Sequence, residues 1–399
     1  MDKKVTGNLQ EFDLIILGAG LIGLTAANLF AKQGFSLALI EAETPLLKWD
    51  ESEIDIRCTA ISRRSQKIFE EIGVWEQITK DRISSYRKMF VWDAAGFGEI
   101  QFDAADVAEP DLGHIIENRV MIKALWENLE KNPKISLFNL CRPKSFHRDE
   151  DKVTIELEEG ILQAKCVVGA DGANSWLRKR AKIKTLESDY HQTALVATVR
   201  TELPHQETAW QRFLPSGPLA FLPLFEPNTS SIVWSASPEK VKELCALEEK
   251  EFCEELAYAL DYKLGKVISA SPPKTFPLSM LQARQMVQKR LALLGDAAHK
   301  IHPLAGLGVN LGLADVAKLV EVITDAHQRQ CDIGHFLVLR KYERARKSEI
   351  MASIAAMEFF KQTFGSQQSL VSTIRSVGLN CVNKSPFLKK QIILQAMGI

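Results

Sequence analysis

Residues 291–315 hold the densest set of groups in this chain that could do chemistry. An apolar run of strand length, residues 291–294, ends abruptly at Gly295 and Asp296. A carboxylate at the end of a buried strand can accept hydrogen bonds from the hydroxyl groups of a sugar-like chain. We therefore expect Gly295 and Asp296 to contact a polyol.

A glycine-rich loop follows, with Pro303, Gly306 and Gly308, and a helical pattern begins at Asn310. Free N–H groups at a helix start can bind a negatively charged oxygen. FAD offers both partners, with its ribityl chain at Asp296 and its flavin N1/O2 edge at Gly308, Val309 and Asn310. A corner whose glycines merely allow close packing explains the same residues, so this stretch alone leaves both readings open.

The N-terminal segment contains a GxGxxG motif in the context that a dinucleotide requires. Residues 12–17 form an apolar strand, residues 18–23 read GAGLIG, and a second strand ends at Glu41. Gly18 allows a tight turn, Gly20 lets the backbone approach a pyrophosphate, and Glu41 can accept hydrogen bonds from ribose hydroxyls. At this point FAD and NAD remain undecided. The expected contacts come from Gly18, Gly20, Leu21, Ile22, Gly23 and Glu41.

A third corner of the same kind surrounds Asp171. The apolar run 161–168 ends in residues 169–172, GADG, so an acid again follows a strand between glycines. Three such corners indicate one long ligand across the carboxyl ends of a parallel sheet. Arg57 lies just past the second strand, where a pyrophosphate or flavin would pass, although a solvated surface charge explains it equally well.

Composition bounds the class of protein. The 399 residues carry 50 basic and 50 acidic side chains, so their zero net charge implies no nucleic-acid partner. Seven scattered cysteines without a CxxC pair favour a reducing cytoplasm and indicate neither a disulfide framework nor a metal site. We find no apolar run of transmembrane length and no signal-peptide pattern, and we expect a cytoplasmic protein.

The charge is unevenly distributed. Residues 340–399 contain ten Lys or Arg and three Glu, which gives 10 − 3 = +7. Ordinary solvated helix faces are one explanation. The alternative is a basic tail that docks peripherally at the inner face of the cytoplasmic membrane or on an acidic partner.

The order of elements predicts an α/β fold with a Rossmann-like FAD-binding domain, an inserted antiparallel β-sheet substrate domain and a helical C-terminal region. The substrate would sit where the β-rich insert meets the FAD-binding part. We expect the first part of the FAD-binding domain at 1–185, with a strand insertion near 86–103. The β-rich domain then covers 186–285, the second FAD-binding part 286–330, and the helical region 331–399.

The chain resembles class A flavoprotein monooxygenases of the para-hydroxybenzoate hydroxylase type and, within them, the ubiquinone-biosynthesis hydroxylases. The likeness runs nearly end to end and is most specific around Asp171 and Asp296. Leu307 departs from the glutamine that is usual in the glycine loop. The motifs are GAGLIG (18–23), the Arg57 segment, ENR with Arg119 (117–119), VVGADGANSWLR (167–178), AFLPL (220–224), GDAAHKIHPLAGLGVNLGLAD (295–315), YERARK (342–347) and QAMG (395–398).

The resemblance implies that NAD(P)H reduces FAD and that a flavin C4a-hydroperoxide hydroxylates a polyprenylated phenol with molecular oxygen. Pro303, Gly306 and Gly308 would form the loop at the reacting flavin ring, and Arg119 would help to hold the cofactor. Residues 231–235 and 332–347 favour hydroxylation at ring position 5, with positions 6 and 1 as alternatives. His299 and His302 are more readily structural than acid–base residues.

Two other functions stay open. An NAD-dependent dehydrogenase explains residues 18–23 and Glu41 but leaves Asp171 and Asp296 without a role. A non-catalytic flavoprotein scaffold in a quinone-biosynthesis assembly would use the basic tail as its docking surface. A homo-oligomer is a further open expectation.

Overall fold

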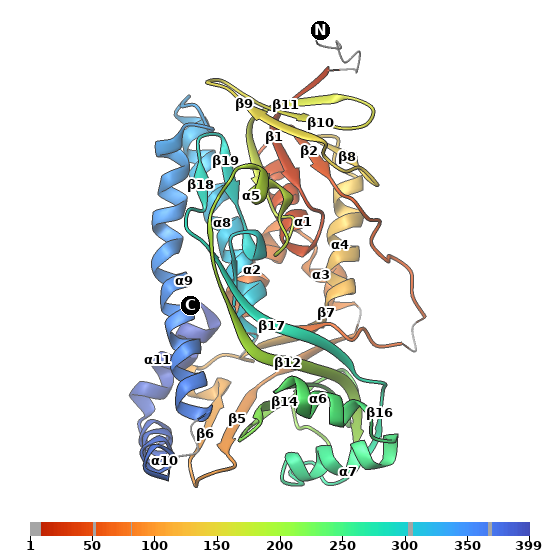
Figure 1. The fold of residues 1–399 in the computed structure, drawn as a ribbon, viewed down its shortest axis with the longest axis vertical. Helices are drawn as coiled ribbons and strands as arrows, with labels where there is room; N and C mark the ends of the chain where they lie inside the picture. Colours follow the sequence, from red (N-terminus) through yellow and green to blue (C-terminus); the bar gives the residue numbers. More distant parts are fainter. Residues whose placement is uncertain (1–8, 51–52, 81, 302–305, 366–368) are drawn as a thin grey trace.

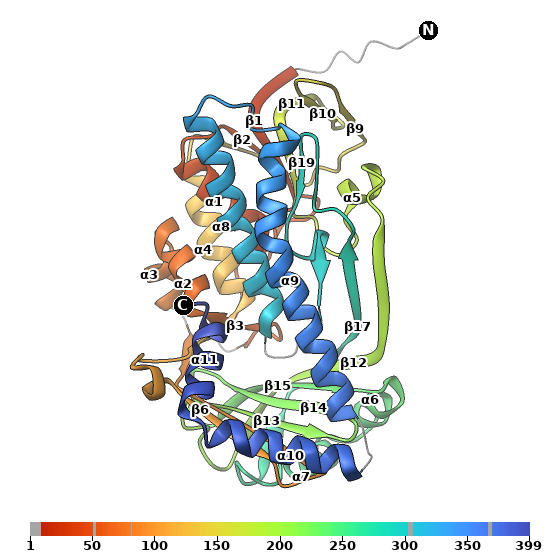
Figure 2. The same cartoon turned by 90° about the vertical axis from the view of Figure 1, so that its left-hand side faces the viewer.

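The computed structural model describes residues 9–50, 53–80, 82–301, 306–365 and 369–399. An eight-stranded sheet occupies one end of the elongated molecule and a nine-stranded sheet the other (Figure 1). A three-stranded sheet lies between them, and long helices run along one side (Figure 2). The fold is therefore mixed α/β, as the sequence predicts.

The eight-stranded sheet has a parallel centre in the order β19-β11-β1-β2-β8. Residues 14–17 and 37–40 are buried apolar runs, which is typical of parallel strands covered on both faces. Helix α1 (Leu21–Lys32) covers this sheet beside α4 (Asn118–Glu130). The strands are β1 (Leu9–Leu17), β2 (Leu37–Ile40), β8 (Ile135–Phe138), β9 (Ser145–Arg148), β10 (Val153–Glu156), β11 (Ile161–Gly169), β18 (Val287–Gln288) and β19 (Leu291–Leu293).

The register of the central strands brings the three acid-and-glycine corners together. Leu17 pairs with Gly169, and Gly169 pairs in turn with Leu293. The N–H of Ala170 donates to the Leu17 carbonyl at 2.8 Å, and the N–H of Leu294 donates to that of Gly169 at 2.9 Å. All three strands thus end at one edge, and the turns that follow them lie side by side.

The nine-stranded sheet is antiparallel except where β13 runs parallel to β5. The expected strand insertion near 86–103 pairs here, far along the chain from its neighbours. Helices α6 (Pro238–Cys245) and α7 (Glu249–Ala259) cover one face. The strands are β5 (Lys88–Asp93), β6 (Glu99–Asp103), β12 (Thr185–Thr201), β13 (Thr208–Leu214), β14 (Gly217–Pro223), β15 (Thr229–Ala236), β16 (Val267–Ala270), β17 (Lys274–Ala283) and β20 (His299–Lys300).

The middle layer contains β3 (Cys58–Ser62), β4 (Ile83–Tyr86) and β7 (Gly113–Glu117). Helix α2 (Arg63–Ile72) begins and ends as its sequence predicts: Ser62 accepts a hydrogen bond from the Ser65 N–H, and Gly73 has a φ of 93°. Asn118 is of a residue type that could cap α4, but it is the first residue of this helix and accepts a hydrogen bond from the Thr59 hydroxyl instead. The short elements nearby are α3 (Trp75–Thr79) and η1 (Ala104–Val107).

Four helices follow the third corner: α8 (Leu307–Gln328), α9 (Phe336–Gly365), α10 (Ser369–Asn383) and α11 (Pro386–Met397). Helix α8 begins three residues before the expected Asn310. Gly308 therefore lies within the first turn of the helix, and Gly306 precedes the helix with a φ of 63°. Within the described residues, no helix is both long and apolar enough to cross a membrane.

Helix α10 closes the outer edge of the nine-stranded sheet. The N–H groups of Glu99 and Gln101 in edge strand β6 donate to the Asn380 and Asn383 side chains, both at 3.2 Å. A Cβ atom on Gly98 would lie only 2.6 Å from the Ser376 Cα, so a glycine is needed where the helix approaches. The buried pair of Asp93 and Arg375, 2.8 Å apart at Nε, fastens the same helix to the preceding turn.

Candidate functional site

The first corner combines one crowded glycine pair with one open glycine. A Cβ on Gly23 would lie 1.8 Å from the Gly18 carbonyl oxygen, and a Cβ on Gly18 would lie 2.5 Å from that of Ala170. By contrast, a Cβ on Gly20 would meet nothing within 4 Å among the described residues, and Gly20 is exposed. Gly18 and Gly23 thus serve packing, while the backbone at Gly20 is open to a ligand.

Glu41, at the end of β2, turns back toward this corner. Its carboxylate accepts a hydrogen bond from the Ala19 N–H at 2.5 Å and another from the Glu43 N–H at 3.0 Å. These two backbone donors fix the carboxylate beside the glycine turn. A half-buried acid in this place can receive ribose hydroxyl groups, which is the role that the sequence predicts for it.

Asp171 lies at the second corner, and only one of its two carboxylate oxygens has a hydrogen-bond partner among the described residues. Its Oδ2 accepts from the Leu177 N–H at 3.0 Å and so satisfies the start of α5 (Trp176–Arg180). Its Oδ1 is buried and has no hydrogen-bond partner among the described residues. A buried carboxylate oxygen without a partner is costly, and hydroxyl donors of a bound ligand would satisfy it.

Asp296 at the third corner is reached by solvent and yet surrounded by protein atoms. Desolvation raises its pKa above the ordinary value, although His299 and Lys300 act in the opposite direction. The side chain is exposed, so a ligand can reach it. A ligand that donates hydroxyl groups would compensate the lost hydration.

Arg178 joins the second corner to the third. It is buried, its Nη1 donates to the Ala297 carbonyl at 2.8 Å, and its Nη2 donates to that of Ala173 at 2.5 Å. The fork geometry of a guanidinium suits two carbonyls at once. Arg178 belongs to the motif of residues 167–178, but the sequence alone does not indicate this role.

A buried ionic cluster holds the third corner from behind. Asp315 accepts from the Gly295 N–H at 3.1 Å, from His299 Nε2 at 2.6 Å and from Arg346 Nε at 2.8 Å. Burial alone would raise the pKa of Asp315, but His299 and Arg346 outweigh it and lower that pKa. His299 thus has a structural partner, in keeping with the structural reading of this histidine.

The start of α8 is pinned by the side chain of Asn310 rather than left free. Asn310 accepts from the Ser62 N–H at 2.9 Å and the Ser65 hydroxyl at 2.7 Å. It donates to the carbonyls of Ala60 and Gly306 at 2.8 and 2.9 Å. The N–H groups of Gly308 and Val309 fall in the first helical turn, where they have no partner within the helix.

The two arginines of the sequence analysis lie in different surroundings. Arg57 is exposed, and its guanidinium carbon lies 5.3 Å from the ring centre of Phe276 on the nine-stranded sheet. Arg119 forms an ion pair with Glu117 at 2.7 Å and stacks on Trp49 at 4.6 Å. The charge of Arg119 is therefore already compensated by the protein.

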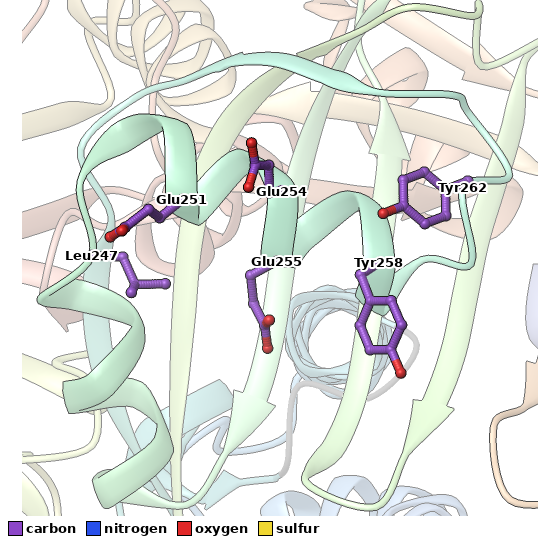
Figure 3. A pocket seen from close by; sticks show the side chains of 6 residues that line it. All are labelled: Leu247, Glu251, Glu254, Glu255, Tyr258 and Tyr262. Carbon is purple, nitrogen blue, oxygen red and sulfur yellow. The ribbon is translucent and has the colours of Figure 1, made fainter.

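Pro303 and His302 lie outside the described residues, as does the side chain of Leu307. Two surface hollows lie elsewhere. One of about 430 Å³ is lined by residues of and around α7 (Figure 3), and the other lies beside α1 and α8. Neither contains a residue of the three corners, so the candidate site rests on the corners themselves.

Comparisons with known proteins agree on one class. The FAD binding domain family matches residues 11–353. The 3-demethoxyubiquinol 3-hydroxylase of Escherichia coli strain K12 is 35% identical over 98% of this chain and 99% of its own. The ubiquinone hydroxylase UbiL of Rhodospirillum rubrum is 34% identical, over 99% and 91%. The structure of p-nitrophenol 4-monooxygenase PnpA from Pseudomonas putida DLL-E4 is 18% identical, covers 97% and 98%, and has a TM-score of 0.78.

Proposed function

Since the chain belongs to the FAD binding domain family and, within it, to the ubiquinone-biosynthesis hydroxylases, we propose that it hydroxylates a polyprenylated phenol at ring position 5. That it is an FAD-dependent monooxygenase of ubiquinone biosynthesis, with NAD(P)H as electron donor, follows from the family itself. This answers the question between FAD and NAD that the GxGxxG motif left open. The substrate and ring position are the proposed part.

The three corners are the proposed binding site of FAD. The buried Asp171 Oδ1 without a partner is the observation that carries this assignment most strongly. Gly20 would admit the pyrophosphate, Glu41 the adenosine ribose, and Asp296 the ribityl hydroxyls. Backbone N–H groups of Gly308 and Val309 would face the flavin. Further contacts are proposed for Leu21, Ile22, Gly295, Pro303, Asn310, Arg57 and Arg119.

Bound FAD supplies the redox chemistry by which oxygen reaches the ring. The part of this chain is to orient and to exclude water. Asn310 ties the start of α8 to Ala60 and Ser62, and so fixes the backbone donors of that helix in one place. The Asp315 cluster does the same for Gly295. Donors held in place before the reaction need no reorganisation during it.

An Asp296→Ala variant tests the cofactor assignment. Each charge-assisted hydrogen bond that is lost should weaken FAD binding by about 1.5–3 kcal/mol. FAD affinity is measured by flavin fluorescence during titration of the apoprotein, with Asp189→Ala on the exposed part of β12 as the control. Unchanged affinity in Asp296→Ala would show that this carboxylate does not bind the ribityl chain.

The proposal for ring position 5 rests on the resemblance of residues 231–235 and 332–347. A second substrate has its own support, because the Escherichia coli relative is named for a 3-demethoxyubiquinol. Complementation of strains blocked at each ring hydroxylation separates the candidates. Rescue of the position-5 block supports the first proposal, and rescue of the position-6 or position-1 block alone would replace it. Phenol-stimulated NAD(P)H oxidation by the purified protein tests turnover itself.

We also propose that the chain works at a surface rather than free in solution. The basic tail of residues 340–399 supports peripheral contact with the inner face of the cytoplasmic membrane, or with acidic partners in a quinone-biosynthesis complex. A homo-oligomer is a further expectation that light scattering of the purified protein tests.

A further inference from the structure

Helix α11 is apolar on two faces. Ile393 and Met397, four residues apart, are buried against η1 and its surroundings. Phe387, Leu388 and Ile392 lie on a different face and are 71%, 46% and 41% exposed. Exposed large apolar side chains that lie close together mark a surface that contacts lipid or another protein. We therefore expect the exposed face of α11 to be covered by a binding partner.

The charges on the chain segment that contains α10 and α11 have one sign. Residues 359–399 contain five Lys or Arg and no Asp or Glu. Arg375 and Lys389 form ion pairs inside the molecule. Lys384 and Lys390 are exposed, at the start and in the middle of the α11 segment. The cover must therefore be both apolar and negatively charged.

We propose that Lys384, Phe387, Leu388, Lys390 and Ile392 form a docking face for an anionic lipid bilayer. The apolar side chains would enter the boundary between headgroups and acyl chains, while the two ammonium groups remain among the phosphates. This names the surface by which the peripheral contact of the proposed function takes place. It assigns that contact to the α10–α11 end rather than to the basic tail as a whole.

The opposite side of the same end of the molecule has a net negative charge, which an anionic bilayer repels. Residues 238–262, which include α6 and α7, carry eight acidic and three basic side chains. Figure 3 shows Glu251, Glu254 and Glu255 together on α7. In Figure 1, α7 lies at the lower right, and α10 and α11 lie at the lower left. This separation orients the molecule with α11 toward the bilayer.

The buried side of the α10–α11 pair covers an apolar part of the nine-stranded sheet. Leu379 and Val382 of α10 pack on Val91, on the face opposite α7, because the neighbouring residue Trp92 belongs to the core beneath α7. Resting on the proposed function, docking at this end would bring the protein to the bilayer that holds its polyprenyl substrate. Each methylene exposed to water weakens partition about fourfold, so the tail must pass from lipid to protein directly.

Flotation of the full-length FAD-bound protein tests the docking face. Vesicles of phosphatidylcholine alone are compared with vesicles that also contain phosphatidylglycerol. Wild type should float with the anionic vesicles only, and less so near 1 M salt, where the Debye length is about 3 Å. Absence from both vesicle types, or equal recovery with both, would overturn the proposal.

Two pairs of variants separate this face from the rest of the surface. Lys384→Glu/Lys390→Glu should lower partition at least roughly 25-fold, since each basic residue near an anionic surface contributes about fivefold. Its control is Lys242→Glu/Lys250→Glu on α6 and α7, which has the same charge change and should float like wild type. Phe387→Ser/Ile392→Ser should also lose flotation, with Leu247→Ser/Tyr258→Ser as its control. Docking variants that float like wild type would sink the assignment.

Retained flavin absorbance shows that the variants are folded, and activity then separates docking from function. The docking variants should lose hydroxylation of a long-tailed phenol held in vesicles but keep that of a soluble short-tailed analogue. A wild type that floats but oxidises neither phenol contradicts the proposed substrate and leaves the docking face standing. If the wild type does not float but forms dimers that Phe387→Ser/Ile392→Ser disrupts, the face would be reassigned to contact with a second copy of the chain.

Discussion

Arg178 spans the gap between two strand ends, because its Nη1 binds the Ala297 carbonyl while its Nη2 binds that of Ala173. The turn that carries Asp171 and the turn that carries Asp296 are therefore set relative to each other by one buried side chain. A ligand that touches both carboxylates depends on that spacing.

Replacing Arg178 should damage stability and cofactor binding together. Arg178→Met leaves two carbonyls without donors and should lower the free energy of unfolding by about 2–4 kcal/mol. Arg178→Lys keeps the charge but loses the planar fork of donors, so its free energy of unfolding should lie between those of the wild type and Arg178→Met. Denaturant unfolding and flavin retention measure both effects, with Lys179→Met on the exposed side of α5 as the control. Flavin retention at the wild-type level in Arg178→Met would show that Arg178 does not set the spacing.

Two glycines of one motif should respond to alanine in opposite ways. In Gly20→Ala the new methyl group meets no described residue within 4 Å, so the apoprotein should keep its stability within about 1 kcal/mol. FAD affinity should nevertheless fall at least about tenfold, because the methyl group occupies the space of the pyrophosphate. Titration of apoprotein with FAD measures this. Unchanged affinity would place the pyrophosphate elsewhere.

Gly23→Ala is the matched counterpart. Its methyl group would lie 1.8 Å from the Gly18 carbonyl oxygen, a clash that should cost about 3 kcal/mol or more in folding. We expect loss of stability in the apoprotein itself, seen by thermal unfolding without FAD. A stable apoprotein would mean that α1 can shift away from β1.

Asp315→Asn should lower stability in a pH-dependent way. At neutral pH it leaves Arg346 and His299 without their buried carboxylate and should cost about 3 kcal/mol. The pKa of Asp315 is lowered in the folded protein, so its contribution is complete above the unfolded-chain pKa near 3.9 and is lost as the pH falls through the lower folded pKa. The difference between wild type and variant should thus narrow below about pH 4.

Denaturant unfolding at several pH values measures that difference. The control is Asp325→Asn in the same helix, because Asp325 pairs with Arg329 at the surface. It should cost less than about 1 kcal/mol. An equal cost for the two variants would contradict the role of the buried cluster.

Gly98→Ala should loosen α10. The added methyl group would lie 2.6 Å from the Ser376 Cα, and backbone cannot yield as a side chain can. We expect faster hydrogen exchange across residues 369–383. Gly378→Ala in the same helix meets nothing within 4 Å among the described residues and should slow exchange, because alanine favours the helix by about 1 kcal/mol. Equal exchange in both variants would contradict the tight approach at Gly98.

The sequence predicts the three corners because each depends on a local pattern. An apolar run followed by an acid between glycines identifies Asp171 and Asp296 without knowledge of the fold, and the parallel pairing of β1, β11 and β19 then follows from the Rossmann-like motif. The cap at Ser62 and the stop at Gly73 are local in the same sense, and the structure confirms both.

Contacts between distant segments could not be predicted in this way. The strand insertion near 86–103 pairs with β13, more than a hundred residues later, because its apolar face matches that sheet. Arg178, Asp315 and Asn310 likewise each have partners in distant segments, at Ala297, Arg346 and Ser62, and no spacing along the chain marks these contacts. The sequence predicts the start of α8 at Asn310, three residues too late, because a glycine usually indicates a break in a helix. In the structure Gly308 lies in the first helical turn.

The Asn380 and Asn383 contacts on strand β6 have a consequence for how the protein is made. The donor Glu99 and the acceptor Asn380 are 281 residues apart, so the ribosome synthesises the strand roughly 15–55 s before its cover, at 5–20 residues per second. During that interval β6 presents unpaired N–H groups, which are a template for pairing with other nascent chains. Helix α10 therefore protects this edge of the sheet only after the helix itself has been synthesised, and the edge is open to such pairing until then.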